Sequence, residues 1–174
     1  MKARRLLLAT LAGLVASSPA HAGELFGGAY AHDIGTSFSR SGPEGGIDMQ
    51  FGWRGGRIGR TPLQPYAFLS VNSAGDTHYG AVGLSAKFGN RIFVRPGLGI
   101  AVHTGSAANH FDPANDDIEF GSQILFEPEF GLGARMTDRL SIEASWVHMS
   151  HAHLFGRQNS GINNLGVRLT WQLR

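Results

Sequence analysis

Apolar and polar residues alternate with a period of two along most of this chain, and that alternation limits the possible folds more than any other feature. Between Arg91 and His103, every even-numbered residue is apolar, whereas the odd-numbered ones are mostly small or charged. Successive side chains of a β-strand point to opposite faces, so this segment is a strand with one continuous apolar face. The pattern recurs and predicts eight strands, at 24–34, 47–54, 63–72, 78–88, 91–103, 118–135, 140–150 and 162–174.

The segment 118–135 shows that the face of these strands opposite the apolar one is polar. One predicted face is apolar, and the other is polar and carries three carboxylates, which cannot lie in an ordinary hydrophobic core. A soluble β-sandwich, with the charged faces in water, is the alternative to a membrane barrel. The apolar face comprises Ile118, Phe120, Ile124, Phe126, Pro128, Phe130 and Leu132, and the polar face comprises Glu119, Gln123, Glu127, Glu129 and Arg135.

The N-terminal segment 1–22 has the features of a secretory signal peptide. Lys2, Arg4 and Arg5 precede an apolar run at 6–16, and an Ala-x-Ala cleavage site ends at Ala22. Three of the 15 basic residues lie in this segment, which leaves 12 against 13 acidic residues in the mature part. A nucleic-acid partner is therefore not expected, since it would require a clustered basic face. The chain has no cysteine, which excludes disulfides and thiol chemistry.

The remaining residues, 23–174, are predicted to form one eight-stranded antiparallel transmembrane β-barrel in a bacterial outer membrane. Connections alternate between short turns and longer loops, as outer-membrane barrels require, and no later stretch is apolar enough for a membrane helix. An eight-stranded barrel is just wide enough to be filled by side chains, so a packed polar interior without a pore is expected. The predicted filling is Asp48, Arg54, Lys87, Arg95, Glu119, Glu127, Glu129, Arg135, Glu143 and Arg168.

The seventh predicted strand carries the candidate catalytic residues. Alternation puts Trp146, His148 and Ser150 on its lipid face, at the extracellular end, with Glu143 on the lumen face. Ionisable groups directed at lipid are energetically expensive and tend to be functional. Residues two apart on one strand face are separated by about 7 Å, so the imidazole can reach the serine hydroxyl and accept its proton.

The last predicted strand and the loop before it supply partners for this pair. Alternation directs Asn163 outward, and an antiparallel neighbour would bring it across from His148. The connecting loop offers Asn159 as a hydrogen-bond donor.

The motif His148-Met149-Ser150-His151-Ala152, followed by Asn159-Ser160-Gly161-Ile162-Asn163, resembles the C-terminal signature of the PagL family of lipid A 3-O-deacylases. The close match covers roughly the last 30 residues. The resemblance implies a barrel esterase that needs no metal or other cofactor and removes the 3-hydroxyacyl chain of lipid A in lipopolysaccharide. It implies that His148 is the general base and Ser150 the nucleophile, and that Asn159 contributes to the oxyanion hole.

The chain departs from the family pattern at two positions. His151 follows the serine where the family usually has an asparagine, and we assign it with Asn159 to the oxyanion and substrate contacts. Asn163 stands where the family has the glutamate that orients the histidine. An asparagine can orient an imidazole through its carbonyl oxygen but supplies no charge. We therefore expect a working but weaker enzyme, with a pseudoenzyme as the alternative.

Several other interpretations remain open from the sequence. The same serine would serve an acyltransferase or phospholipase, and a barrel of the OmpA or OmpX kind would have no catalytic role. A metal site of His148, His151 and His153 is disfavoured because alternation separates the first from the others. The acidic loop residues Asp112, Asp116 and Asp117 have no assigned role, although the last two are candidates for a substitute acid. The oligomeric state is also open, a homodimer included.

Overall fold

The computed structural model describes residues 23–35, 44–110 and 118–173, and all regular secondary structure in these ranges is β-strand. Within them, no helix is long and apolar enough to cross a membrane. The predicted signal peptide at 1–22 lies outside the described residues. The strands are β1 (Glu24–Ala31), β2 (Ile47–Arg54), β3 (Leu63–Asn72), β4 (Tyr79–Ala86), β5 (Phe88–Gly89), β6 (Ile92–His103), β7 (Ile124–Arg135), β8 (Leu140–Met149) and β9 (Ile162–Gln172).

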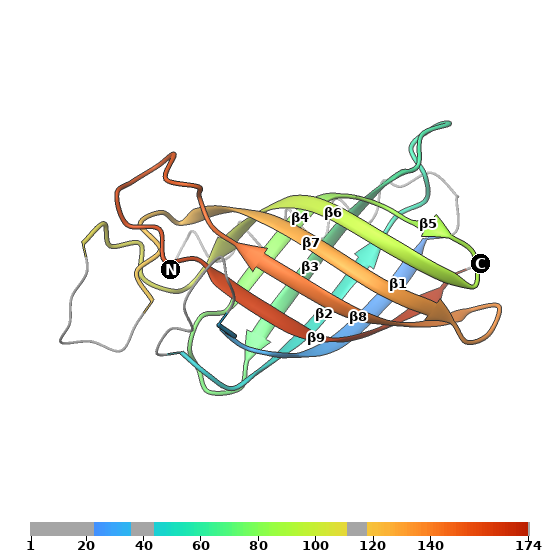
Figure 1. Cartoon of the computed structure of the whole chain (residues 1–174), viewed down its shortest axis with the longest axis horizontal. Coiled ribbons are helices and arrows are strands. Elements are labelled where there is room, and N and C mark those ends of the chain that lie inside the picture. Colours follow the sequence, from blue (N-terminus) through green and yellow to red (C-terminus); the bar gives the residue numbers. More distant parts are fainter. Residues whose placement is uncertain (1–22, 36–43, 111–117, 174) are drawn as a thin grey trace, which may run out of the picture.

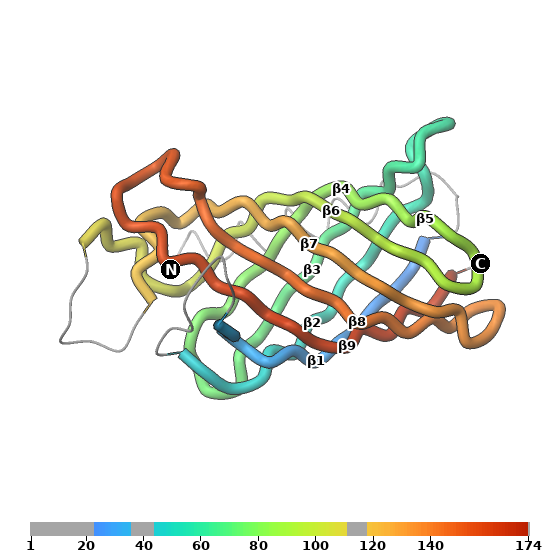
Figure 2. The backbone as a smooth tube through the Cα atoms, in the orientation of Figure 1, coloured from blue at the N-terminus to red at the C-terminus, as the bar shows by residue number. Residues whose placement is uncertain are grey.

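The strands form one closed antiparallel barrel (Figures 1 and 2). Apart from β4 and β5, strands that are consecutive in the sequence pair with each other, and β1 pairs with β9 to close the sheet. The short β5 continues β4 past Lys87, and both pair with β6. Together β4 and β5 therefore occupy one strand position, and the nine labelled strands form an eight-stranded barrel wall. This confirms the predicted fold class. The strands are joined by short connections such as Gly89–Ile92 at one end, the short-turn end, and by longer connections at the other, the long-loop end.

The outer face of the barrel is apolar and the inner face is not. In β6, the side chains of Ile92, Leu98 and Ile100 are exposed on the outside, while Phe93 and Arg95 are buried inside. The alternation predicted from the sequence is thus the alternation between the two faces of the wall. An exposed apolar belt of this kind is typical of a barrel surrounded by lipid.

Buried ion pairs fill the middle of the barrel. The side chains of Arg54, Arg95 and Arg168 are completely buried, and each contacts at least one carboxylate. Arg168 approaches both Glu129 and Glu143, and Arg95 bonds the same two residues. Buried charges are tolerated only when they are paired and hydrogen-bonded, so these pairs link β6, β7, β8 and β9 to one another, and β1 to β2, from inside the barrel.

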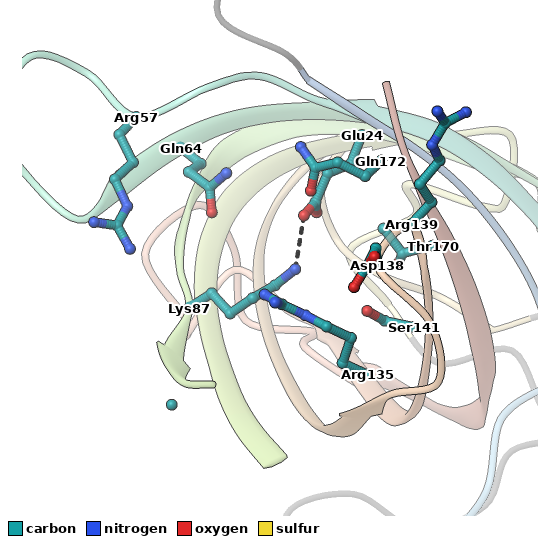
Figure 3. Close-up of a pocket in the computed structure, with 11 residues that line it drawn as sticks. Glu24, Arg57, Gln64, Lys87, Arg135, Asp138, Arg139, Ser141, Thr170 and Gln172 are labelled. Atoms are coloured by element: carbon teal, nitrogen blue, oxygen red, sulfur yellow. Dashed lines mark hydrogen bonds and ion pairs between the residues drawn. The ribbon is translucent and has the colours of Figure 1, made fainter. Parts of the chain in front are cut away.

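Most of the predicted interior residues are buried, but two lie at the short-turn mouth of the barrel. Lys87 bonds Glu24 at 2.8 Å there (Figure 3). Arg135 was predicted to fill the interior and is instead exposed, because β7 ends at this residue and its side chain reaches the mouth. The buried members of the predicted set are Asp48, Arg54, Arg95, Glu119, Glu127, Glu129, Glu143 and Arg168.

The predicted strand 118–135 is wrong at its start. Strand β7 begins at Ile124, and Ile118 and Phe120, predicted to face outward, are only 3% and 0% exposed. The cause is Gly121, whose φ of +74° turns the chain in a conformation that favours glycine and interrupts the alternation. Phe120 packs against His103 with ring centroids 4.3 Å apart, and Gln123, predicted to face inward, is exposed.

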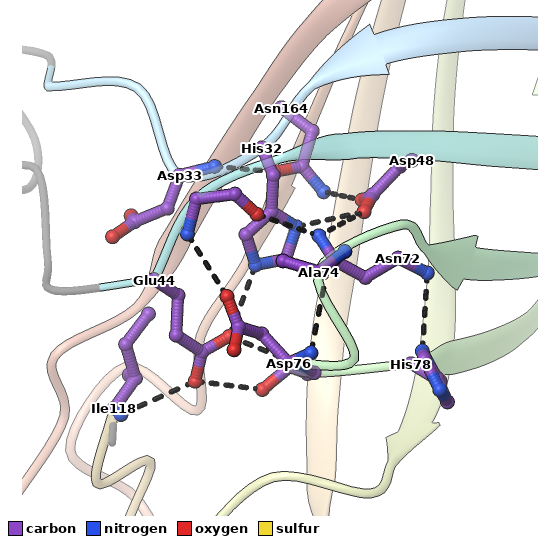
Figure 4. A network of polar contacts seen from close by, with 12 residues as sticks. His32, Asp33, Glu44, Asp48, Asn72, Ala74, Asp76, His78, Ile118 and Asn164 are labelled. Atoms are coloured by element: carbon purple, nitrogen blue, oxygen red, sulfur yellow. Dashed lines mark hydrogen bonds and ion pairs between the residues drawn. The ribbon is translucent and has the colours of Figure 1, made fainter. Parts of the chain in front are cut away.

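The long-loop end is closed from inside by a polar network around His32, just past the end of β1 (Figure 4). Its Nδ1 lies 2.8 Å from Asp48 and its Nε2 lies 3.0 Å from Glu44. Glu44 also accepts hydrogen bonds from the backbone and hydroxyl of Thr77 and from the backbone N–H of Ile118. The network therefore ties three of the long connections to the barrel wall.

Candidate active site

The outer face of β8 and the residue just beyond it present three candidate functional side chains in a row at the long-loop end. Trp146, His148 and Ser150 alternate with the buried residues Val147 and Met149, as the pleat of a strand requires. Ser150 lies just beyond β8 and is held by two backbone hydrogen bonds to Phe126 of β7, at 3.1 and 2.8 Å. The candidate nucleophile Ser150 is therefore anchored on the barrel wall rather than in a free loop.

Three side chains from two strands form a continuous hydrogen-bonded chain. The Nε2 atom of His148 lies 3.0 Å from Ser150 Oγ, and its Nδ1 atom lies 3.0 Å from Asn163 Oδ1. His148 and Asn163 are direct cross-strand partners in the β8–β9 register. Asn163 is fully buried and His148 is partly exposed. A serine, an imidazole and an orienting acceptor in this order form the arrangement of a serine nucleophile with its general base.

Trp146 contributes a contact that the sequence analysis did not anticipate. Its indole N–H donates to Asn163 Oδ1 at 3.1 Å, the same oxygen that faces His148. Its ring also stacks on the imidazole, with centroids 5.8 Å apart and an interplanar angle of 16°. The available signal was the position of Trp146 two residues before His148 on the same face.

The loop after β8 is built around His151. This side chain is completely buried, with Nε2 2.6 Å from the carbonyl oxygen of Gln158 and Nδ1 3.2 Å from the backbone N of Phe155. Both ring nitrogens are thus engaged by the loop itself. The two residues that follow, Ala152 and His153, have positive φ values of 51° and 60°. Such conformations are costly for residues with a Cβ and persist only where the surroundings enforce them.

Asn159 lies on the same loop and faces back toward the end of β8. Its Oδ1 accepts the backbone N–H of His151 at 2.9 Å, which leaves the amide nitrogen as the end that can donate to a ligand. Its Nδ2 lies 3.4 Å from Nδ1 of His153, which is exposed. This hydrogen bond therefore holds Asn159 against the backbone of His151, the residue that directly follows Ser150.

The remaining candidate residues are dispersed. Glu143 faces the lumen and bonds Arg95, so it is directed away from His148. The rings of His151 and His153 lie 6.3 Å apart, but His148 is engaged by Ser150 and Asn163 instead. Among the described residues, no three histidine, aspartate or glutamate side chains are grouped so as to hold a metal ion. The loop residues Asp112, Asp116 and Asp117 lie outside the described part of the chain.

An apolar surface borders the serine on the side of β7. The rings of Phe126 and Phe155 stack with centroids 6.1 Å apart, and Leu154 beside them is 68% exposed. A polar cavity of about 200 Å³ lies at the opposite, short-turn mouth, lined by Lys87, Arg135 and Ser141 among others (Figure 3). Its position excludes any part in the chemistry of Ser150, because β8 runs the whole length of the wall between them.

A comparison with protein families identifies the chain. Residues 42–172 match the model of the lipid A 3-O-deacylase (PagL) family. The chain belongs to the PagL family. A comparison with curated proteins found no match, so membership rests on the family model. The matched range includes all the residues of the candidate site.

Solved structures share the barrel at low sequence identity. The crystal structure of the outer membrane enzyme PagL has a TM-score of 0.62 and 19% identity, and covers 85% of this chain and 98% of that one. Neisserial surface protein A gives a TM-score of 0.56 and 14% identity, with coverage of 87% and 97%. A de novo designed transmembrane β-barrel gives 0.55 and 9%, with coverage of 87% and 95%. These likenesses support the outer-membrane barrel fold alone.

Proposed function

We propose that this member of the PagL family hydrolyses the 3-O-linked hydroxyacyl ester of lipid A, with Ser150 as nucleophile and His148 as general base. The observation that carries the proposal is the hydrogen-bonded chain Asn163–His148–Ser150 on the outer face of the barrel. A barrel buried in lipid gains nothing structurally from exposing such a chain, since polar groups facing lipid cost free energy. Lipid A itself is a lipid of the outer leaflet, which this face would meet.

The proposed placement follows from the two ends of the barrel. Residues 1–22 would direct export and be removed, and the barrel would insert into the outer membrane with its long-loop end outside the cell. Ser150 lies at that end of β8 and would be level with the sugar and ester groups of the outer leaflet. The apolar surface of Phe126, Leu154 and Phe155 would then receive the acyl chain that is removed.

The proposed reaction needs only the residues of this chain and water. His148 Nε2 accepts the proton of Ser150 as Oγ attacks the ester carbonyl carbon. The imidazolium then donates this proton to the departing 3-oxygen of the sugar, which leaves as a hydroxyl group. Water, deprotonated by the same imidazole, attacks the acyl-serine carbonyl carbon, and the imidazolium returns this proton to Ser150 Oγ as the ester bond breaks and the 3-hydroxy fatty acid is released. Asn163 keeps Nδ1 protonated and directed away from the serine throughout.

Two loop residues support the reaction in different ways. Asn159 is proposed to stabilise the oxyanion with its amide nitrogen, because its oxygen is occupied by the backbone of His151. The buried ring of His151 is proposed to act through the loop conformation rather than by touching the substrate.

The deciding experiment is mass spectrometry of lipid A from cells that express the wild-type protein, Ser150→Ala or Ser141→Ala. Ser141 lies on the same strand at the other end, so it controls for the substitution itself. Loss of one 3-hydroxyacyl chain with wild type and Ser141→Ala, but not with Ser150→Ala, is the expected result. Unchanged lipid A with folded barrel present in all three would contradict the proposal and favour a non-catalytic barrel. Phospholipid profiles from the same cells separate deacylation of lipid A from phospholipase or acyltransferase activity.

A further inference from the structure

An amide in the position that orients the histidine raises a problem that a carboxylate does not. The two oxygens of a carboxylate are equivalent acceptors, whereas an amide has one accepting end and one donating end of nearly the same shape. If Asn163 turned its nitrogen toward His148, the facing Nδ1 would have to be the unprotonated acceptor. The proton would then sit on Nε2, which could no longer accept the proton of Ser150.

The indole of Trp146 resolves this ambiguity because it can only donate. Its N–H lies 3.1 Å from the side-chain oxygen of Asn163, and only the oxygen end of the amide can accept it. The same oxygen lies 3.0 Å from His148 Nδ1, so that nitrogen must carry the proton. The other nitrogen, Nε2, is then an acceptor 3.0 Å from Ser150 Oγ, as a general base must be.

We propose that Trp146 is a positioning residue, which orients the Asn163 amide through its indole N–H and thereby sets the His148 tautomer that can deprotonate Ser150. This inference rests on the proposed function, since it assigns His148 as the base. In the serine-protease template, an amide in place of the carboxylate costs about four orders of magnitude, largely through the wrong tautomer. The Trp146 contact favours the productive tautomer and so reduces the part of that loss that comes from the wrong tautomer.

The setting of these three side chains makes the orientation firm. Asn163 is fully buried, so water cannot easily satisfy whichever end of the amide is misdirected. A flipped amide would place its N–H₂ group against the indole N–H, and both donors would face each other. The stacking of the Trp146 and His148 rings holds the indole beside the imidazole, so the N–H remains directed at the amide oxygen.

Trp146→Phe removes the N–H and retains an aromatic ring, and it is compared in two backgrounds. With Asn163, we expect kcat for hydroxyacyl release to fall about three- to tenfold at unchanged KM, because the amide loses the donor that selects its oxygen end. With Asn163→Asp, we expect the same substitution to change kcat less than about twofold, since a carboxylate needs no orientation. Trp171→Phe, on the outer face of β9 at the short-turn end, is the matched control and should have no effect in either background.

A second readout reports the tautomer without relying on turnover. The ¹⁵N ring signals of His148, assigned by their loss in His148→Gln, should show a protonated Nδ1 in the wild type and a mixture of tautomers in Trp146→Phe. Replacement of Trp146 by β-(3-benzothienyl)alanine, which has the indole shape but no N–H, gives the same test if the phenylalanine variant does not fold.

Each outcome decides one of the two claims. An unchanged tautomer in both Trp146 variants, or an equal fall in kcat with Asn163 and with Asn163→Asp, would overturn the role of Trp146. Absence of any Ser150-dependent deacylation would overturn the proposed function, while the ring signals would still decide whether Trp146 sets the tautomer. A tautomer change together with a background-dependent fall in kcat would establish the inference.

Discussion

His32 and His148 are each bonded at both ring nitrogens by side chains, yet their surroundings suit them to opposite tasks. His32 lies inside the long-loop end between the carboxylates of Asp48 and Glu44, with no exposed side-chain surface. His148 lies on the outer face between a neutral amide oxygen and a hydroxyl group. Carboxylates stabilise the imidazolium, whereas neutral partners leave the ring free to gain and lose a proton. Partner charge therefore separates a structural cation from a candidate base.

The charge of His32 follows from its partners. Burial alone would lower its pKa, but the hydrogen bonds that His32 donates to Asp48 and Glu44 outweigh burial and raise the pKa of His32 to about 9. For the carboxyl group of Glu44, burial acts in the opposite direction and would raise the pKa. The hydrogen bonds from His32 and Thr77 outweigh burial and lower the pKa of Glu44 below its ordinary value. At neutral pH the network is thus an ion pair that joins the connection after β1 to the wall.

Asn163→Glu is the substitution that makes the surroundings of His148 more like those of His32, and it carries the largest expected effect. A carboxylate beside Nδ1 would stabilise the imidazolium formed when Ser150 is deprotonated. We expect deacylation to be retained or raised, by up to about tenfold. The rate of hydroxyacyl release from purified lipid A is the measurement, with Asn164→Glu, whose side chain faces the lumen, as the control that should impair folding instead. A large fall in rate with an intact barrel would show that the triad geometry of the PagL family does not transfer to this chain.

Much of the candidate site, including the face on which each of its strand residues lies, could be predicted from the sequence. Alternation decides the face of each wall residue, so it predicted that His148 and Ser150 share one face and that Asn163 lies on the outer face of the neighbouring strand. It also predicted the closed barrel and most of its buried charges. Strand alternation depends only on residue parity, which is why it can be read without coordinates.

The sequence did not reveal two kinds of feature. In one, the alternation of side chains between the two faces is interrupted; in the other, a contact depends on the direction in which a single group points. Gly121 interrupts the alternation, so Ile118 and Phe120 turn inward against the prediction. His151 enters a loop whose next two residues have positive φ values, and its ring is buried by contacts no periodic pattern encodes. The hydrogen bond of Trp146 depends on the direction of one N–H group, which parity does not specify.

Raising the pH should deprotonate His32 and so lower the stability of the folded barrel. We expect this effect to be smaller than that of Asn163→Glu and larger than that of Asn109→Ala, described below. The folded-state pKa of His32 is raised, so its contribution is fully present below its ordinary value of 6.5 and is lost as the pH rises through about 9. We expect the midpoint of thermal unfolding to fall by a few degrees between pH 6.5 and pH 9.5. Heat-modifiable migration in gels, or circular dichroism in detergent, measures that midpoint.

His32→Gln is the control for this pH dependence. The variant lacks the titrating group, so it should start from a lower midpoint and show a flatter profile over the same range. It should also retain the Ser150-dependent deacylation, because His32 faces the interior and the candidate site faces outward. An equal pH dependence in the variant and the wild type would assign the loss of stability to another group.

Asn109→Ala tests how far the outer site depends on its supporting loop, and the expected effect is the smallest. The Asn109 side-chain oxygen accepts the backbone N–H groups of Arg157 and Gln158, at 2.7 and 2.9 Å. The carbonyl of Gln158 in turn bonds the buried ring of His151, whose backbone N–H holds Asn159. Removal of the Asn109 side chain should weaken this series of hydrogen bonds in the loop. It should leave His148 and Ser150 in place, because these two residues are held by the barrel wall.

We therefore expect kcat to fall by no more than about fivefold in Asn109→Ala, since the loss of one or two exposed hydrogen bonds costs only about 1 kcal/mol. Asn90→Ala, in the short turn at the other end of the barrel, is the matched control and should leave the rate unchanged. A fall as large as that of Ser150→Ala would mean that the loop, rather than the strand pair β8–β9, holds the reacting groups in place. A small fall would instead place the chemistry on the rigid wall, with the loop serving to complete the oxyanion contacts.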